Sequence, residues 1–133
     1  GNFAENLKAA CPDGIDVDFE NVGGEIFDAA LSQMNVHGRI ALCGMISAYN
    51  AAKTPEGPKN LRYVLTHRLR MQGLIVFDWK ERIPECIQQL GQWSKEGKLK
   101  IREDVRTGGL EAFAETLNFL YTGGNNGKVV LKV

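Results

Sequence analysis

Two short segments carry the residues that could act on a ligand. Asn21 and the pair Gly23-Gly24 follow an alternating segment at residues 15–20, and residues 43–49 (Cys-Gly-Met-Ile-Ser-Ala-Tyr) follow an apolar one. The Asn21 amide can hydrogen-bond a ribose or another amide, and glycine allows a flat or charged ligand to approach the backbone closely. The Tyr49 phenol can donate a hydrogen bond to a developing oxyanion.

Each of these assignments has a structural alternative. Gly23-Gly24 equally suits a plain strand-to-helix turn with Asn21 as a cap, and the pattern does not choose between the two interpretations. For Tyr49, the pattern alone favours a surface tyrosine. Cys43 lies in an apolar run without a nearby base, which favours a small core residue over a nucleophile.

Two further features carry no chemistry of their own. Residues 123–128 (Gly-Gly-Asn-Asn-Gly-Lys) resemble a phosphate-binding loop, but Thr122 replaces its first glycine and Val129 follows the lysine, so a turn is expected. His37 and His67 have no partner at ligand spacing, which favours structural roles and predicts no metal site.

The elements that would position these residues alternate between strands and helices. The period-two segment from Ile15 predicts a strand, and the apolar stripe from Glu25 through Met34 predicts a helix that ends at His37-Gly38. The carboxyl ends of parallel strands share one crevice, so the residues after each strand are expected to meet. The remaining predicted elements are a helix over residues 3–10, strands over residues 39–43, 71–77, 101–106 and 128–133, a functional loop over residues 45–60, and helices over residues 61–69, 84–96 (Ile87, Leu90 and Trp93 inward) and 110–120.

Composition narrows the class of protein. The 133 residues suit one domain or a fragment of one, and 44% apolar residues suffice for a core. Sixteen basic and sixteen acidic residues cancel, which argues against binding to nucleic acid or an anionic membrane. The three cysteines are widely spaced, no segment suggests a leader or a membrane span, and a cytoplasmic location is expected.

Four segments in register carry a family resemblance. They are residues 18–24 (DFENVGG), 38–50 (GRIALCGMISAYN), 70–76 (RMQGLIV) and 125–130 (NNGKVV). Together they resemble the C-terminal part of the zinc-independent medium-chain dehydrogenases/reductases, in the group of leukotriene B4 12-hydroxydehydrogenase, prostaglandin reductase and alkenal reductase. This resemblance implies NADPH-dependent reduction of the C=C bond of α,β-unsaturated ketones and aldehydes, with hydride passing to the β-carbon to leave an enolate.

The resemblance also implies roles for individual residues. Asn21 would contact the ribose on the nicotinamide side, and Asn125 would reach the cofactor from the C-terminal segment. Tyr49 would stabilise the enolate, directly or through the ribose hydroxyls. The loop lining the cofactor would comprise Cys43, Gly44, Met45, Ile46, Ser47, Ala48 and Tyr49, and the nicotinamide edge would be held by Leu74, Ile75 and Val76.

The implied fold is α/β, the second half of a Rossmann-like parallel sheet flanked by helices. Residues 1–100 would form the second half of the dinucleotide-binding domain. Residues 101–133 would be a strand–helix–strand segment that returns to the sheet of the catalytic domain. The sequence contains no Gly-x-Gly-x-x-Gly, so the chain is expected to bind NADP(H) poorly by itself, because that loop and its helix anchor the pyrophosphate.

Three functional interpretations follow. The chain is a fragment of an enone reductase that is inactive alone, a stand-alone oligomeric half-domain that acts as a scaffold or small-ligand binder, or one part of a split reductase. Half a sheet exposes a strand edge, so we expect a homo-oligomer, most simply a dimer, which in the family pairs strands beside residues 74–77.

Overall fold

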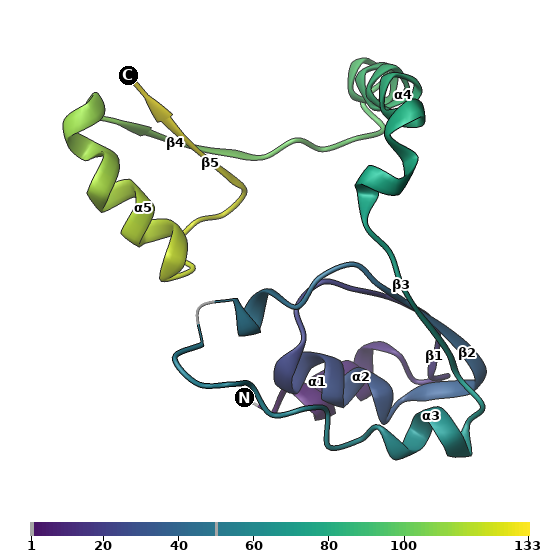
Figure 1. Cartoon of the computed structure of the whole chain (residues 1–133). Helices are drawn as coiled ribbons and strands as arrows, with labels where there is room; N and C mark the ends of the chain where they lie inside the picture. Colours follow the sequence, from purple (N-terminus) through teal and green to yellow (C-terminus); the bar gives the residue numbers. More distant parts are fainter. Residues whose placement is uncertain (1, 50) are drawn as a thin grey trace. The chain divides into compact units, whose positions relative to one another are not determined.

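The first compact unit of the chain is built around a parallel sheet. The computed structural model describes residues 2–49 and 51–133, so Asn50, the last residue of one family-like segment, lies outside the described residues. The chain forms two compact units, residues 1–80 and 81–133. The sheet of the first unit has the strand order β1-β2-β3 (Figure 1). Its strands are β1 (Ile15–Glu20), β2 (Met34–Leu42) and β3 (Arg70–Gly73).

Short helices connect these strands. Helix α1 (Phe3–Ala10) covers the predicted residues 3–10, and Gly14 then turns the chain with φ 82°. Helix α2 begins directly after Gly23, which has φ 74° and ψ −161°. The helices and 3-10 turns of this unit are α1 (Phe3–Ala10), α2 (Gly24–Leu31), η1 (Ile46–Ala48), α3 (Arg62–Thr66) and η2 (Val76–Arg82), the last crossing the boundary between the units.

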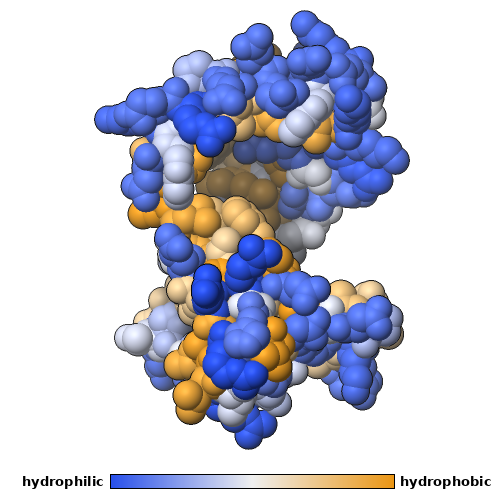
Figure 2. All heavy atoms as spheres, turned by 90° about the vertical axis from the view of Figure 1, so that its right-hand side faces the viewer, coloured by the Kyte–Doolittle hydropathy of each residue, from blue (hydrophilic) through white to orange (hydrophobic). Residues whose placement is uncertain are grey.

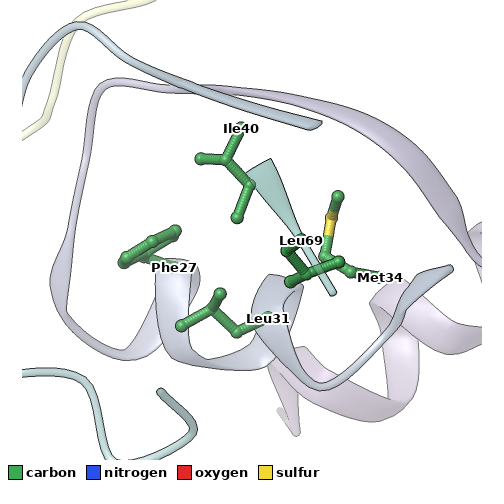
Figure 3. Packing of buried hydrophobic residues seen from close by; sticks show 5 residues of the cluster. All are labelled: Phe27, Leu31, Met34, Ile40 and Leu69. Atoms are coloured by element: carbon green, nitrogen blue, oxygen red, sulfur yellow. The ribbon is translucent and has the colours of Figure 1, made fainter. Parts of the chain in front are cut away.

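The core lies between α2 and one face of the sheet. Figure 3 shows Phe27 and Leu31 of α2 directed toward Ile40 of β2, with Met34 and Leu69 beside them. Leu31 is fully buried, and burial of such a side chain contributes about 1.5–3 kcal/mol. This cluster fixes the sheet on α2 and thereby fixes the strand ends.

The predicted end of the second helix is wrong. Helix α2 ends at Leu31, and Met34 already belongs to β2, where it pairs with Ile15. The Ile15 N–H donates to the Gln33 carbonyl over 3.0 Å, so strand pairing outweighs the helical spacing of Met34. His37, the predicted helix end, lies inside β2 with φ 65°.

The predicted third strand is wrong beyond Gly73. The Leu74 N–H still donates to the Leu42 carbonyl over 3.0 Å, but β2 ends at Leu42. Residues beyond Leu74 therefore have no strand partner there, and a 3-10 turn begins at Val76. Helix α3, at five residues, is also shorter than the predicted helix over residues 61–69.

The second unit contains a strand–helix–strand motif. Strands β4 (Glu103–Thr107) and β5 (Lys128–Lys132) are parallel, and η3 (Leu110–Ala112) and α5 (Phe113–Tyr121) connect them. Helix α4 (Ile83–Lys95) agrees with the predicted helix over residues 84–96 to within one residue at each end; it carries a proline in its first turn and is followed by Gly97 at φ 69°. The predicted α/β class with parallel sheets and flanking helices is thus confirmed.

Many apolar side chains remain on the surface. On β1, Val17 and Phe19 are 57% and 61% exposed. The expectation that Ile87, Leu90 and Trp93 face inward is wrong, because α4 has no buried residue. Figure 2 shows such apolar residues at the surface among polar ones. Among the described residues, no helix is both long and apolar enough to cross a bilayer.

Candidate functional site

The candidate site lies where the three strands of the first sheet end together. The register aligns Glu20 of β1 with Leu42 of β2, and Leu42 with Gly73 of β3. The segments that follow the strands therefore leave the sheet at one edge. This alignment brings residues 21–24, 43–49 and 74–75 into the same region, as expected for a parallel sheet.

Backbone hydrogen bonds join the first two of these segments. The Cys43 and Gly44 N–H groups both donate to the Glu20 carbonyl, over 2.9 and 3.1 Å. One step further, the Ile46 N–H donates to the Asn21 carbonyl over 3.0 Å, and the Ser47 N–H donates to the Val22 carbonyl over 2.9 Å. The structure thus brings together Asn21 and the predicted cofactor loop.

The phenol of Tyr49 folds back over this junction. Its oxygen accepts the Met45 N–H over 3.3 Å. A Cβ placed on Gly44 would lie 3.2 Å from that oxygen and 3.1 Å from the Asn21 carbonyl oxygen. Because Tyr49 Oη is the acceptor in the bond with Met45, its own proton is available for a second partner. The residue is 67% exposed, so that partner can come from outside the chain.

A hollow of about 510 Å³ opens beside Tyr49, a size suited to a small organic ligand. Its wall is mostly apolar, with the Tyr49 phenol as a hydrogen-bond donor and the Asp78 carboxylate as its only acidic group. The residues around the hollow, all in the first unit, are Leu42, Cys43, Gly44, Met45, Tyr49, Gly73, Leu74, Ile75 and Asp78.

Glycine shapes the backbone next to this junction. Gly23 and Gly24 have φ values of 74° and 57°. An added Cβ on either residue would lie 3.1 Å from Ser47 Oγ. The bare backbone and the serine hydroxyl therefore form a cradle that any side chain would fill. Gly23 is buried whereas Gly24 and Ser47 are exposed, so a ligand can approach the main chain closely at Gly24.

Some predicted site residues do not line the hollow. Ile46, Ser47 and Ala48 form η1, and the hollow does not include them. Val76 begins η2 and is 57% exposed. Asn125 lies in the second unit, where its amide donates to the Gly127 carbonyl over 2.7 Å and closes its own turn. The cofactor contacts assigned to these residues stay predictions.

Two acidic residues near the carboxyl ends of the strands were not predicted from the sequence as part of the site. Asp78 borders the hollow, and its spacing to Glu81 in the sequence suggests only a helix cap. Glu20 is 3% exposed and accepts two backbone N–H groups with its side chain. Its position between an alternating strand and a glycine turn is the one signal that could have indicated it.

Burial, and then the charge of Glu20, raises the pKa of Asp18.

A metal centre finds no support within residues 2–49 and 51–133. They contain no group of three or more His, Cys, Asp or Glu side chains that could hold a metal ion. Cys11, Cys43 and Cys86 are free thiols, and Cys43 borders the hollow half-buried.

A parallel α/β unit with its candidate site at the strand ends is the architecture of dinucleotide-dependent dehydrogenases. Residues 1–131 match the profile of the family described as zinc-binding dehydrogenase. The chain belongs to this family, and the predicted relationship to its NADPH-dependent reductases is confirmed by the relatives below.

Two curated relatives are named as reductases, and the chain spans less than two fifths of the length of each. The chain is 47% identical to the NADPH-dependent curcumin reductase of Escherichia coli, over 99% of this chain and 39% of that protein. It is 46% identical to the NADP⁺-dependent 2-alkenal reductase of Nicotiana tabacum, over 96% of this chain and 36% of that protein. The crystal structure of CurA from Vibrio vulnificus in complex with NADPH matches with a TM-score of 0.84 and 41% identity, over 100% of this chain and 41% of CurA.

Proposed function

We propose that the chain supplies the nicotinamide side of an NADPH-dependent reductase acting on the C=C bond of α,β-unsaturated ketones and aldehydes. Residues 1–100 would be the second half of its cofactor domain, and residues 101–133 the segment that returns to its catalytic domain. The observation that carries this proposal is the junction of residues 21–24 with residues 43–49 beside a 510 Å³ hollow. The chain spans about 39% of the Escherichia coli relative, so the activity belongs to a longer assembly.

The residues that follow the carboxyl ends of the three strands fit NADP(H). Gly24 and Ser47 are exposed, which leaves main chain accessible beside them, and Asn21 and the backbone of Leu74 and Ile75 would provide polar contacts. NADPH supplies the hydride, and the protein supplies alignment and charge stabilisation. The phosphate-binding loop is absent from the sequence, so binding by this chain alone is expected to be weak.

Tyr49 is the group of this site suited to stabilise an oxyanion. The Met45 N–H holds the phenol oxygen at 3.3 Å, which places that oxygen beside Gly44. The phenol proton can then be donated to the carbonyl oxygen of an enone as negative charge develops there. A donor placed in advance at that position lowers the barrier, because it needs little reorganisation during the reaction.

Titration of the 133-residue chain with NADPH, followed by ¹⁵N NMR, tests the proposal. We expect shifts that begin at high micromolar or millimolar ligand and that concentrate on the amides of Asn21, Gly23, Gly44 and Tyr49. Gly44→Ala narrows the space beside Asn21 and Tyr49 and should suppress the shifts, whereas Gly57→Ala, with no atom within 4 Å of the added Cβ, should not. Absence of shifts at this edge would refute the proposal.

Micromolar affinity of the chain for NADPH would contradict the part of the proposal that expects weak binding. A Kd of about 1 μM corresponds to about 8 kcal/mol of binding free energy. Reaching that value without the pyrophosphate loop would mean that the site is complete as it stands. The alternative of a stand-alone small-ligand binder would then gain, and the alternative of one part of a split reductase would lose support.

We also propose that the chain forms a homodimer along β3. Beyond Gly73, Ile75, Val76 and Phe77 are 61%, 57% and 72% exposed. The β3 edge away from β2 has no partner strand within the described residues, and such an edge favours pairing with a second chain. Sedimentation at micromolar concentration should show a dimer, and Val76→Lys should shift it to a monomer. A monomer of the unmodified chain would contradict this proposal.

A further inference from the structure

One side chain at the carboxyl ends of the strands, that of Glu20, has no role in the function proposed above. Glu20 is 3% exposed, and it is the only buried charged residue among those the structure describes. Removing a carboxylate from water is unfavourable unless polar partners replace the water. Such a residue at the end of β1 therefore requires a compensating set of contacts.

The turn after β1 provides these contacts. Glu20 Oε1 accepts the backbone N–H groups of Val22 and of Gly23, the latter over 2.7 Å. Hydrogen bonds from N–H groups to an ionised carboxylate are stronger than those between neutral groups. The side chain thus folds back onto its own chain and holds Val22 and Gly23 in one conformation.

The main chain of the same residue holds the second loop. The Glu20 carbonyl accepts the N–H groups of Cys43 and Gly44, over 2.9 and 3.1 Å. The Asn21 and Val22 carbonyls, which follow it directly, accept the N–H groups of Ile46 and Ser47. Fixing the turn after Glu20 therefore also fixes the loop that carries Tyr49.

We propose that Glu20 is the positioning residue of the candidate site. Its carboxylate sets the turn at residues 21–24, and through that turn it sets the loop at residues 43–49 and the distance between them. Glu20 acts through the backbone and does not touch the ligand. The assignment rests on the proposed function in one respect, namely that NADP(H) occupies this edge.

Amide hydrogen exchange of the 133-residue chain tests the carboxylate contacts without any ligand. In Glu20→Ala, we expect exchange to accelerate about tenfold or more at Val22, Gly23, Ile46 and Ser47, with little change in the core of α2. Glu20→Gln retains an acceptor oxygen and should accelerate these amides less. If Glu20→Ala does not fold, Glu20→Gln carries the test, with an increase of several-fold confined to the same amides.

Ile40→Val is the matched control, because it weakens the core beneath the same sheet and leaves the turn intact. We expect it to accelerate exchange across the unit without preference for the turn and loop amides. A uniform acceleration in the Glu20 variants, like that of Ile40→Val, would overturn the proposal and leave Glu20 with a general structural role.

NADPH titration of the same variants links the turn to the site. We expect Glu20→Ala to weaken binding about tenfold or more, Glu20→Gln to weaken it less, and Ile40→Val to leave it within about twofold. Equal affinity of Glu20→Ala and the unmodified chain would refute the positioning role while the proposed function stands. Absence of binding by the unmodified chain would instead refute the proposed function, and with it the occupant on which the role depends.

Discussion

Gly23→Ala tests whether the glycine turn between β1 and α2 is a fixed part of the fold. Gly23 has φ 74° and ψ −161°, a combination that essentially only glycine adopts and that strains other residues by about 1–3 kcal/mol. The added Cβ would also lie 3.1 Å from Ser47 Oγ and 3.4 Å from Met45 Cβ. The serine hydroxyl can move, so backbone strain supplies most of the expected effect.

The control is Gly57→Ala. A Cβ there meets no atom within 4 Å, and Gly57 does not have a positive φ. Both substitutions restrict the unfolded chain in the same way, which stabilises by about 0.4–1 kcal/mol, so this contribution cancels between the two variants. The difference in their free energies of unfolding should therefore equal the strain, about 1–3 kcal/mol in favour of Gly57→Ala.

Urea unfolding measured from ¹⁵N amide signals of residues 2–80 is the suitable assay. The chain has two compact units, so a single spectroscopic average would mix two transitions. A difference below about 0.5 kcal/mol, the ordinary scatter of surface substitutions, would show that the turn relaxes freely. The cradle at Gly23 and Gly24 could then not be a fixed element of the site.

Three further predictions concern the same unit. Burial and the charge of Glu20 raise the pKa of Asp18 above its ordinary 3.8, so the folded state binds this proton more tightly and loses stability as the pH rises through the raised pKa. Asp18→Asn should therefore stabilise the unit at pH 7 but not at pH 3 in urea unfolding, and an equal gain at both pH values would contradict this cause. Leu31→Ala, at a fully buried position, should cost about 2–5 kcal/mol, and a loss below 1 kcal/mol would show that the core collapses around the gap. Tyr49→Phe, in a reductase reconstituted with the missing part, should lower kcat about 10²-fold with little change in the Kd for NADPH, and unchanged turnover would remove Tyr49 from the mechanism.

Elements with strong local signals were predictable from the sequence. The alternation from Ile15 gives β1, and Pro84 and Gly97 mark the start and end of α4. These signals are local, because proline and glycine restrict or extend the backbone conformations of single residues. The parallel order of the strands and the meeting of their carboxyl ends followed from them.

Element boundaries that are set by strand pairing were not predictable from the sequence. Ser32 is only a weak turn signal and Gln33 is none, so the local sequence gives little indication that the chain leaves α2 before Met34. The end of β3 at Gly73 depends on the end of β2 at Leu42, which lies thirty-one residues earlier in the chain. In the same way, the sequence suggested Asn21 and the loop ending at Tyr49, but the bonds that join them are contacts between main-chain groups.

The use of main-chain groups at the strand edge has a consequence for variation. The loop at residues 43–49 is attached through carbonyl oxygens of Glu20, Asn21 and Val22, and a carbonyl is the same whatever side chain stands beside it. Side chains at Val22, Ile46 and Ser47 can therefore be exchanged without removing these bonds. A protein of this kind can change its ligand preference by substitutions around the hollow beside Tyr49. The main-chain hydrogen bonds that hold residues 43–49 in place are retained through such substitutions.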